Sequence, residues 1–339
     1  MSMPYRTRRV LLRILTVLLV LVLVTVVVVG CWLLWLDRYV VYTRQDGAKL
    51  DFSLSEEVPE GELAVPPTQA EAPSIYYNSG EDAVNTSTEL AQLLGYYADS
   101  AALKEDIGAV RSQVKTLPAG TAVMVDVKSI YGSFYYSSEV STSRASDIDP
   151  AEMDKLIGEL NSGVFYTIAR LPALRDYEYG LNHVPDGLPT AGGYLWIDDD
   201  GCYWLNPQSQ GTIAYLVQIV NELKALGFDE VVFSDFYFPQ TDGIVFQGDK
   251  AQALTTAAET LLTTCGTDRF AVSFVDGGSF TLPEGRSRLY LEGVEAADVA
   301  SRVEETGIAD KAIRVVFLTE VHDTRFDAYS VLRPLAAAH

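Results

Sequence analysis

The chain has 339 residues, with 25 basic and 46 acidic side chains and a net charge of −21. This balance argues against binding to nucleic acid or to anionic lipid headgroups, because both carry negative charge themselves. Three cysteines are too few for a disulfide framework, and of these only Cys202 and Cys265 lie outside the apolar N-terminal segment. Composition therefore excludes a nucleic-acid-binding protein and a disulfide-stapled domain, but it identifies no partner.

An uncharged apolar run extends from Ile14 to Leu36. As a helix of about 1.5 Å per residue it is roughly 35 Å long, which is enough to cross a membrane. Four arginines and no acidic residue precede it, so residues 1–13 are predicted to be cytoplasmic and residues after Leu36 extracytoplasmic. The sequence thus predicts a single-pass anchor in the cell membrane.

Two other forms of export are consistent with part of this segment. A cleaved signal peptide usually has an apolar region of only about 7–15 residues and a small-residue cleavage site, whereas this run is longer and ends in Trp-Leu-Leu-Trp-Leu. The stretch from Val28 to Cys31 resembles a bacterial lipobox, which would make Cys31 a lipidated N-terminus. The uncleaved helix and the lipoprotein would both leave the domain tethered outside the membrane.

Two short segments separate the anchor from the main domain. Residues 37–54 alternate as two strands, 38–43 and 48–54, around Arg44-Gln-Asp-Gly47, and this pattern predicts a β-hairpin. Residues 55–74 are acidic and rich in proline and alanine, which is typical of an extended linker. The folded domain is therefore expected at residues 75–339.

Residues 75–339 alternate short apolar runs with helical stretches. Uninterrupted apolar strands between helices favour a parallel sheet covered on both faces. Seven such units predict an α/β fold of the (β/α)8 TIM-barrel type, possibly irregular or incomplete because no eighth strand is obvious, although residues 75–78 are one candidate. The predicted strands are 93–97, 122–127, 165–171, 230–236, 269–275, 288–292 and 313–319, and the predicted helices are 100–117, 149–162, 210–226, 250–265 and 296–307.

Several kinds of chemistry lack their motifs. Only three histidines occur, and the chain has no zinc-binding spacing, nucleophile elbow, P-loop or dinucleotide-binding glycine motif. The run Asp198-Asp-Asp-Gly201 lacks the spacing of a calcium-binding EF-hand, so it is interpreted as a solvated turn. We expect no metal and no organic cofactor, which leaves carboxylates as the working groups of any enzyme.

Charged residues occur at the ends of the predicted strands. In a TIM barrel these ends form the active-site face, and a buried charge is costly unless it is paired or lies in a solvated cleft. Each residue taken alone is well explained as a strand cap or a surface ion pair, but the whole set favours a site. The set comprises Asp126, Lys128, Arg170, Asp235, Asp276, Glu292 and Glu320.

Paired carboxylates at a barrel mouth are the apparatus of glycoside hydrolysis, in which one donates a proton and the other attacks or activates water. Aromatic side chains suit the faces of sugar rings, and many of them follow the second to fourth strands. The same aromatics would also serve to pack loops over the barrel. They are Tyr131, Phe134, Tyr135, Tyr136, Tyr177, Tyr179, Tyr194, Trp196, Tyr203, Trp204 and Tyr237.

Four segments resemble the DUF4015 family of putative glycoside hydrolase domains. They are 123–128 together with Gly132 and Tyr135, then 168–170, 196–207 and 227–239. The resemblance is clear from residue 95 to 239 and weak from there to 335. It implies a bacterial TIM-barrel-like domain of the kind assigned to sugar hydrolysis by remote similarity to glycosidases.

The chain departs from the family pattern at two places. The fourth-strand motif of the family reads Phe-Asp-Tyr-Val-Arg-Phe-Pro, whereas this chain has Ser234 at the aspartate position, Asp235 one residue later and Tyr237 at the arginine position. Because side chains alternate along a strand, Asp235 serves the site only if the strand bulges or has already ended. After the second strand, Ser129 and Ile130 stand where the family often has acidic residues.

The leading hypothesis is a membrane-anchored extracytoplasmic O-glycosyl hydrolase that acts on polysaccharide or cell-wall glycan. The alternative is a catalytically inactive barrel that binds glycan or scaffolds envelope proteins. No nucleic-acid partner is expected, and the oligomeric state is left open. The predicted catalytic residues are Asp126, Asp235, Asp276 and Glu292, and the predicted substrate-binding residues are Lys128, Arg170, Tyr135, Trp196, Trp204, Asn206, Tyr237 and Glu320.

Overall fold

The computed structural model describes residues 40–43, 47–50, 90–140, 144–278 and 280–335. The chain divides into two units, residues 1–78 and 79–339. In the first unit β1 (Val40–Thr43) and β2 (Gly47–Leu50) pair antiparallel, which confirms the predicted hairpin. The predicted membrane helix, the linker and residues 75–78 lie outside the described residues, and within the described ranges no helix is long and apolar enough to span a membrane.

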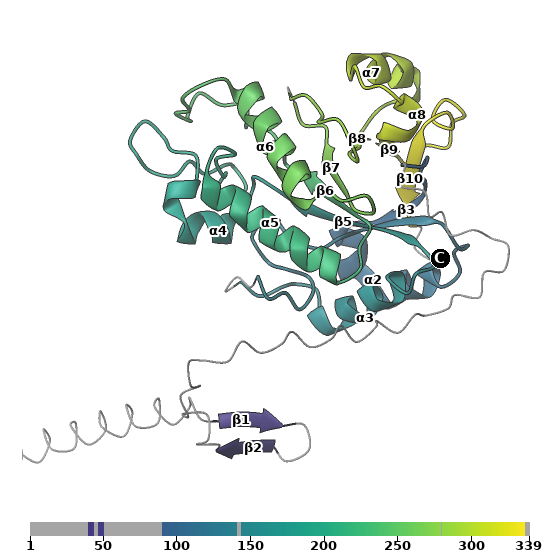
Figure 1. The fold of residues 1–339 in the computed structure, drawn as a ribbon, viewed down its shortest axis with the longest axis horizontal. Coiled ribbons are helices and arrows are strands. Elements are labelled where there is room, and N and C mark those ends of the chain that lie inside the picture. Colours follow the sequence, from purple (N-terminus) through teal and green to yellow (C-terminus); the bar gives the residue numbers. More distant parts are fainter. Residues whose placement is uncertain (1–39, 44–46, 51–89, 141–143, 279, 336–339) are drawn as a thin grey trace, which may run out of the picture. The chain divides into compact units, whose positions relative to one another are not determined.

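The second unit is a closed barrel of eight parallel strands, which confirms the predicted (β/α)8 fold (Figure 1). The strand order around the barrel is β10-β3-β4-β5-β6-β7-β8-β9, so that the last strand closes against the first. The bounds are β3 Leu94–Ala98, β4 Ala122–Asp126, β5 Tyr166–Pro172, β6 Glu230–Ser234, β7 Ala271–Val275, β8 Leu289–Glu292, β9 Val315–Leu318 and β10 Ser330–Pro334.

The strand that the sequence did not reveal is β10. Its Leu332 pairs with Leu318 of β9 on one side and with Gly95 of β3 on the other, so the barrel is complete. The segment is only five residues long and ends in Arg333 and Pro334. Because a charged residue and a proline are unusual in a central strand, its composition carries little strand signal.

Helices cover the barrel unevenly. Five of them begin at polar side chains that accept hydrogen bonds from backbone N–H groups of the first turn, namely Asp99, Asp149, Asp176, Ser209 and Asp249. The described residues between β7 and β8, and those between β9 and β10, contain no helix, so the irregularity expected from the sequence lies in the outer layer. The helices are α2 Ser100–Val114, α3 Pro150–Leu160, α4 Tyr177–Asn182, η3 Val184–Asp186, α5 Gln210–Ala225, α6 Lys250–Cys265, η4 Ala296–Asp298, α7 Val299–Glu305 and α8 Lys311–Arg314.

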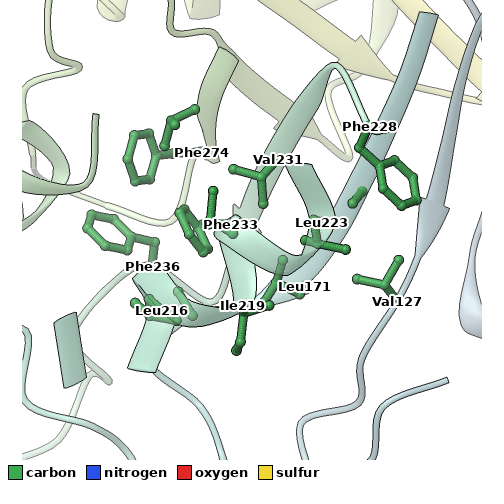
Figure 2. Packing of buried hydrophobic residues seen from close by; sticks show 14 of the residues in the cluster. Val127, Leu171, Leu216, Ile219, Leu223, Phe228, Val231, Phe233, Phe236 and Phe274 are labelled. Atoms are coloured by element: carbon green, nitrogen blue, oxygen red, sulfur yellow. The ribbon is translucent and has the colours of Figure 1, made fainter. Parts of the chain in front are cut away.

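Alternation along the strands separates two apolar layers. On β4, β5 and β6, the even-numbered Met124, Ile168 and Val232 fill the barrel interior. The odd-numbered neighbours pack outward against the helices, and Figure 2 shows Leu171, Val231 and Phe233 close to side chains of α5. This alternation decides which residues at the strand ends reach the mouth of the barrel.

A buried ion pair lies inside the barrel, at the end opposite to the carboxyl ends of the strands. Arg288 donates from Nη1 to Glu230, and both side chains are at most 1% exposed. The hydroxyl of Tyr166, at 2.8 Å, and that of Tyr290, at 2.9 Å, donate to the same carboxylate. Arg288 also donates to the backbone carbonyl of Ala91 at 2.9 Å. These bonds satisfy both charges, as burial at this depth requires.

The two cysteines of the barrel do not form a disulfide. Cys202 and Cys265 are free and buried, and burial raises the pKa of each thiol, to about 11 for Cys202. They are therefore small apolar residues of the interior.

Candidate functional site

A cleft of about 350 Å³ opens at the carboxyl ends of β4, β5 and β6, beside the start of α2. In TIM barrels this end of the strands carries the active site. The cleft holds four basic and three acidic side chains together with two tyrosines. Its lining comprises Ser100, Lys104, Asp126, Lys128, Ser129, Ile130, Tyr131, Ser133, Tyr135, Arg144, Asp147, Arg170, Leu171, Pro172, Ser234 and Asp235.

Arg170 links two of the predicted carboxylates. Its Nε lies 2.6 Å from Oδ1 of Asp126 and its Nη2 lies 3.2 Å from Oδ2, while Nη1 lies 2.6 Å from Oε1 of Glu292. The backbone N–H of Ser100, in the first turn of α2, donates to Oδ2 of Asp126 at 2.8 Å. Asp126 is thereby fixed in orientation by three donors, and the positive end of the α2 dipole favours its negative charge.

Asp235 reaches the cleft because the strand has already ended. β6 stops at Ser234, and the next residue has a φ of +50°, in the left-handed region that few residues other than glycine adopt. Along an unbroken strand Ser234 would face inward and Asp235 outward. The left-handed turn places both of them in the cleft lining. The sequence analysis required the strand to bulge or to end before Asp235, and the structure shows that it ends there.

The environment of Asp235 favours its neutral form. Burial raises the pKa of this carboxyl, and the positive charge of Arg175, a hydrogen bond from Ser234 at 3.2 Å and the charges of Arg170 and Lys128 only partly oppose the effect. Within the described ranges no cation lies close enough to form an ion pair with it. Asp235 is thus the carboxyl of the cleft that is best suited to hold a proton.

Lys128 forms the inner wall of the cleft through a buried ion pair. Its Nζ lies 2.6 Å from Oδ2 of Asp176, and both side chains are at most 1% exposed. Asp176 also accepts from the hydroxyl of Tyr215 and from the backbone N–H of Tyr179, each at 2.9 Å. The ammonium group is therefore already neutralised within the protein. It supports the loops of the mouth and contributes little free charge.

A second arginine fixes the aromatic side of the barrel mouth. Arg175 donates from Nε to Asp198 at 2.6 Å and from Nη2 to Asp200 at 2.5 Å, and its guanidinium lies over the ring of Trp204. Trp204 donates from Nε1 to Asp198 at 2.9 Å. Burial raises the pKa of Asp198, but the hydrogen bonds from Arg175, Cys202 and Trp204 lower it overall. Two of the three aspartates in this run, Asp198 and Asp200, are thus partners of one arginine.

The predicted aromatic residues form a packed group. The rings of Trp204 and Tyr237 are 5.0 Å apart, and those of Trp196 and Trp204 are 6.5 Å apart. Trp204 is buried, whereas Trp196 and Tyr237 are half-buried. Burial and the charge of Asp235 raise the pKa of the Tyr237 phenol. These three rings pack against one another, and none of them belongs to the lining of the cleft, so their role in binding sugar stays a prediction.

Tyr135 stands beside Asp126 at the entrance of the cleft. It is buried, and burial raises the pKa of its phenol to about 12, with a further contribution from the negative charge of Asp126. The phenol therefore remains a hydrogen-bond donor at neutral pH. Such a donor is suited to a sugar hydroxyl.

Seven predicted residues do not belong to the cleft lining: Glu292, Trp196, Trp204 and Tyr237, already described, and Asp276, Asn206 and Glu320. Asp276 follows Val275, which faces the barrel interior, so alternation turns Asp276 outward, where its Oδ2 lies 2.8 Å from Nη2 of Arg302 in α7. Asn206 accepts at Oδ1 from the backbone N–H of Gln208 at 3.0 Å and shapes the turn before α5. Glu320 is exposed at the mouth, where its charge contributes to raising the pKa of Tyr97 after burial.

Sequence reasoning missed several residues of the cleft. Ser100 follows the first strand, whose end was not considered, and Arg144 with Asp147 belongs to a long segment between β4 and α3 that has no periodic pattern. The sequence pattern predicts only that Lys104 lies in a helix. Its position four residues into α2 is the one signal that could have placed it at the mouth.

The described part of the chain contains no group of three or more histidine, cysteine, aspartate or glutamate side chains arranged to hold a metal ion. The cleft lining presents carboxyl, guanidinium, ammonium, phenol and hydroxyl groups.

Residues 104–266 match the model of the DUF4015 family, described as a putative glycosyl hydrolase domain. The match confirms the resemblance that the four motifs indicated, and it includes β4, β5 and β6 with Asp126, Arg170 and Asp235. None of the curated proteins matches the sequence.

Solved structures with a similar fold include a hypothetical protein from Ruminiclostridium thermocellum, at 20% identity and a TM-score of 0.43, covering 53% of this chain and 96% of that one. The glycoside hydrolase domain of PelA from Pseudomonas aeruginosa aligns at 12% identity and a TM-score of 0.42, and the alignment covers 73% of this chain and 95% of that one. The α-galactosidase AgaA from Geobacillus stearothermophilus aligns at 9% identity and a TM-score of 0.48, and the alignment covers 73% of this chain and 39% of that one. At these values no residue role is carried over from them.

Proposed function

We propose that this protein is a glycoside hydrolase that acts on polysaccharide at the cleft of β4, β5 and β6. The observation that carries the proposal is a pair of carboxyl groups in unlike surroundings within one cleft. Asp126 is held by Arg170 and the start of α2, whereas Asp235 has no ion-pair partner among the described residues and a raised pKa. Two carboxyl groups whose environments differ in this way are suited to different roles in acid–base catalysis.

In this mechanism Asp235 is the general acid. Its raised pKa keeps the proton on the carboxyl until the glycosidic oxygen accepts it as the bond to the anomeric carbon breaks. Asp126 acts on the opposite side of the sugar ring as the nucleophile or as the base that activates water. Arg170 and Ser100 fix the direction of its oxygens, and Glu292 holds the other edge of Arg170.

The test is hydrolysis by the full chain, kept in a polyoxyethylene detergent so that no alkyl glycoside is present. Release of reducing ends from a panel of polysaccharides is compared for the wild type, Asp126→Asn and Asp235→Asn. General acid catalysis contributes about 10²–10⁴-fold, so Asp235→Asn should lower kcat by that range and remove the alkaline limb of the pH profile. An unchanged kcat or an unchanged alkaline limb in Asp235→Asn would refute the assignment.

A glycan-binding barrel without catalysis is the second candidate, and one observation favours it. Both oxygens of Asp126 are engaged by Arg170, which leaves little freedom for attack on a substrate. If the wild type binds glycan but releases no reducing ends from any polysaccharide, this candidate replaces the first.

The location of the domain is part of the proposal. The apolar run at residues 14–36 and the arginines before it support a single-pass anchor with the barrel outside the membrane. Alkaline phosphatase fused after residue 339 is active only outside the cytoplasm, so an inactive fusion would reject this topology.

A further inference from the structure

Most charges in the cleft are neutralised by a partner. Lys104 lies 3.0 Å from Asp147, Lys128 lies 2.6 Å from Asp176, and Arg170 is shared by Asp126 and Glu292. Among the described residues two charged groups of the lining remain without an ion pair: the carboxyl of Asp235 and the guanidinium of Arg144. Arg144 is therefore the one cation among the described residues of the lining that has no carboxylate partner.

Aromatic rings hold Arg144 at the rim of the cleft. Its guanidinium carbon lies 4.9 Å from the ring centre of Tyr131 and 5.5 Å from that of Tyr177. Tyr177 is in turn stacked on Tyr203, with ring centres 5.4 Å apart. The adjacent backbone is also fixed, because the hydroxyl of Ser133 donates to the carbonyl of Ala145 at 2.9 Å. Arg144 is therefore positioned without the use of a carboxylate.

This support leaves the hydrogen-bonding edge of the guanidinium available. Stacking engages the face of the group, whereas its five N–H donors lie in the plane and match the two oxygens of a carboxylate or a sulfate. Arg144 is exposed, so this edge can be reached from the cleft. Because the chain has a net charge of −21, its surface as a whole repels an anionic polymer, and a cation without a carboxylate partner is the group of the cleft best suited to attract one.

We propose that Arg144 binds the anionic group of an acidic glycan, so that the substrate is a polysaccharide bearing carboxylate or sulfate groups. This inference rests on the proposed function in one respect only, namely that the cleft receives a glycan. It assigns the substrate class, and it places Arg144 as the residue that selects charged sugars over neutral ones.

Binding of the full chain, in a polyoxyethylene detergent, to three soluble probes tests the proposal: polygalacturonate for carboxylate, dextran sulfate for sulfate, and dextran as the neutral polymer. The wild type should bind at least one anionic probe more tightly than dextran, and added salt should weaken that binding. Arg144→Gln should weaken it about tenfold, which corresponds to about 1.4 kcal/mol and to the loss of one charged hydrogen-bonding group.

Lys104→Gln is the matched control, because it removes an equal charge from the same cleft. Lys104 is already paired with Asp147, and both groups are exposed, so its loss should weaken binding less than about threefold. Which anionic probe loses affinity in Arg144→Gln distinguishes carboxylate from sulfate as the recognised group.

Equal affinity of the wild type for dextran and both anionic probes would overturn the proposal, as would equal losses in Arg144→Gln and Lys104→Gln. The readout is binding, so it is separate from catalysis. If Arg144 governs the binding of an anionic probe but no polysaccharide is cut, the substrate-class inference stands and the hydrolase proposal fails. If polysaccharides are cut but only neutral ones bind, the hydrolase proposal stands and this one fails.

Discussion

Replacing Arg170 with methionine tests the central feature of the site, the guanidinium shared by two carboxylates. Arg170 makes two hydrogen bonds to Asp126, whose side chain is 13% exposed, and one to Glu292, whose side chain is 45% exposed. A hydrogen bond to a charged group contributes about 1.5–3 kcal/mol when it is shielded, whereas an exposed ion pair contributes about 0–1 kcal/mol. We therefore expect a coupling free energy of about 2–3 kcal/mol between Arg170 and Asp126, and below about 1 kcal/mol between Arg170 and Glu292.

Two double-mutant cycles measure these couplings. One combines Arg170→Met with Asp126→Asn and the other with Glu292→Gln, and the free energy of unfolding is taken from urea titrations followed by tryptophan fluorescence. The Glu292 cycle is the internal control, because it uses the same arginine. Couplings of equal size in the two cycles, or a coupling to Asp126 below about 0.5 kcal/mol, would refute the view that Arg170 serves mainly to hold Asp126.

Two further predictions concern buried charge. Arg288→Met leaves Glu230 without its cation in the barrel interior and should lower the free energy of unfolding by about 3–5 kcal/mol. Removing the exposed Arg325 should lower it by less than about 1 kcal/mol. Equal losses of the two variants in chemical denaturation would contradict the buried pairing. Asp235→Asn should stabilise the fold at pH 7, because burial raises the pKa of Asp235 and the ionised form is therefore disfavoured in the folded state. This gain should vanish below about pH 3.9, where the carboxyl is protonated in both states, and a gain that persists there would exclude the linkage.

Alternation explains why much of the site was predictable. Apolar strands of five to seven residues with a fixed inward and outward pattern place every second side chain at the barrel interior. Asp126 and Arg170 follow Met124 and Ile168 in this pattern, and Glu292 follows Tyr290, so their meeting at one mouth follows from the sequence once the barrel is assumed. The fold itself was predictable for the same reason.

The residues whose surroundings the sequence did not reveal are those whose position depends on local backbone conformation or on loops. Asp276 sits at a strand end like the others, but it follows an inward-facing residue and therefore turns toward Arg302. Arg144 lies in a segment without periodicity, and only the contact of its side chain with Tyr131 and Tyr177 places it at the cleft. Neither kind of information is contained in a hydrophobic pattern.

The left-handed conformation of Asp235 bears directly on whether the shifted fourth-strand motif abolishes a site. In the family motif an aspartate occupies the position of Ser234, which alternation turns inward. Here the strand ends at Ser234, and a φ of +50° at the next residue brings a carboxyl into the same cleft from one position later. An aspartate in this region carries a conformational cost that glycine would avoid, and such costs persist where the surrounding structure fixes them, commonly at functional sites. The shift therefore relocates a carboxyl group rather than removing it. Among the described residues this carboxyl forms no ion pair, and burial raises its pKa.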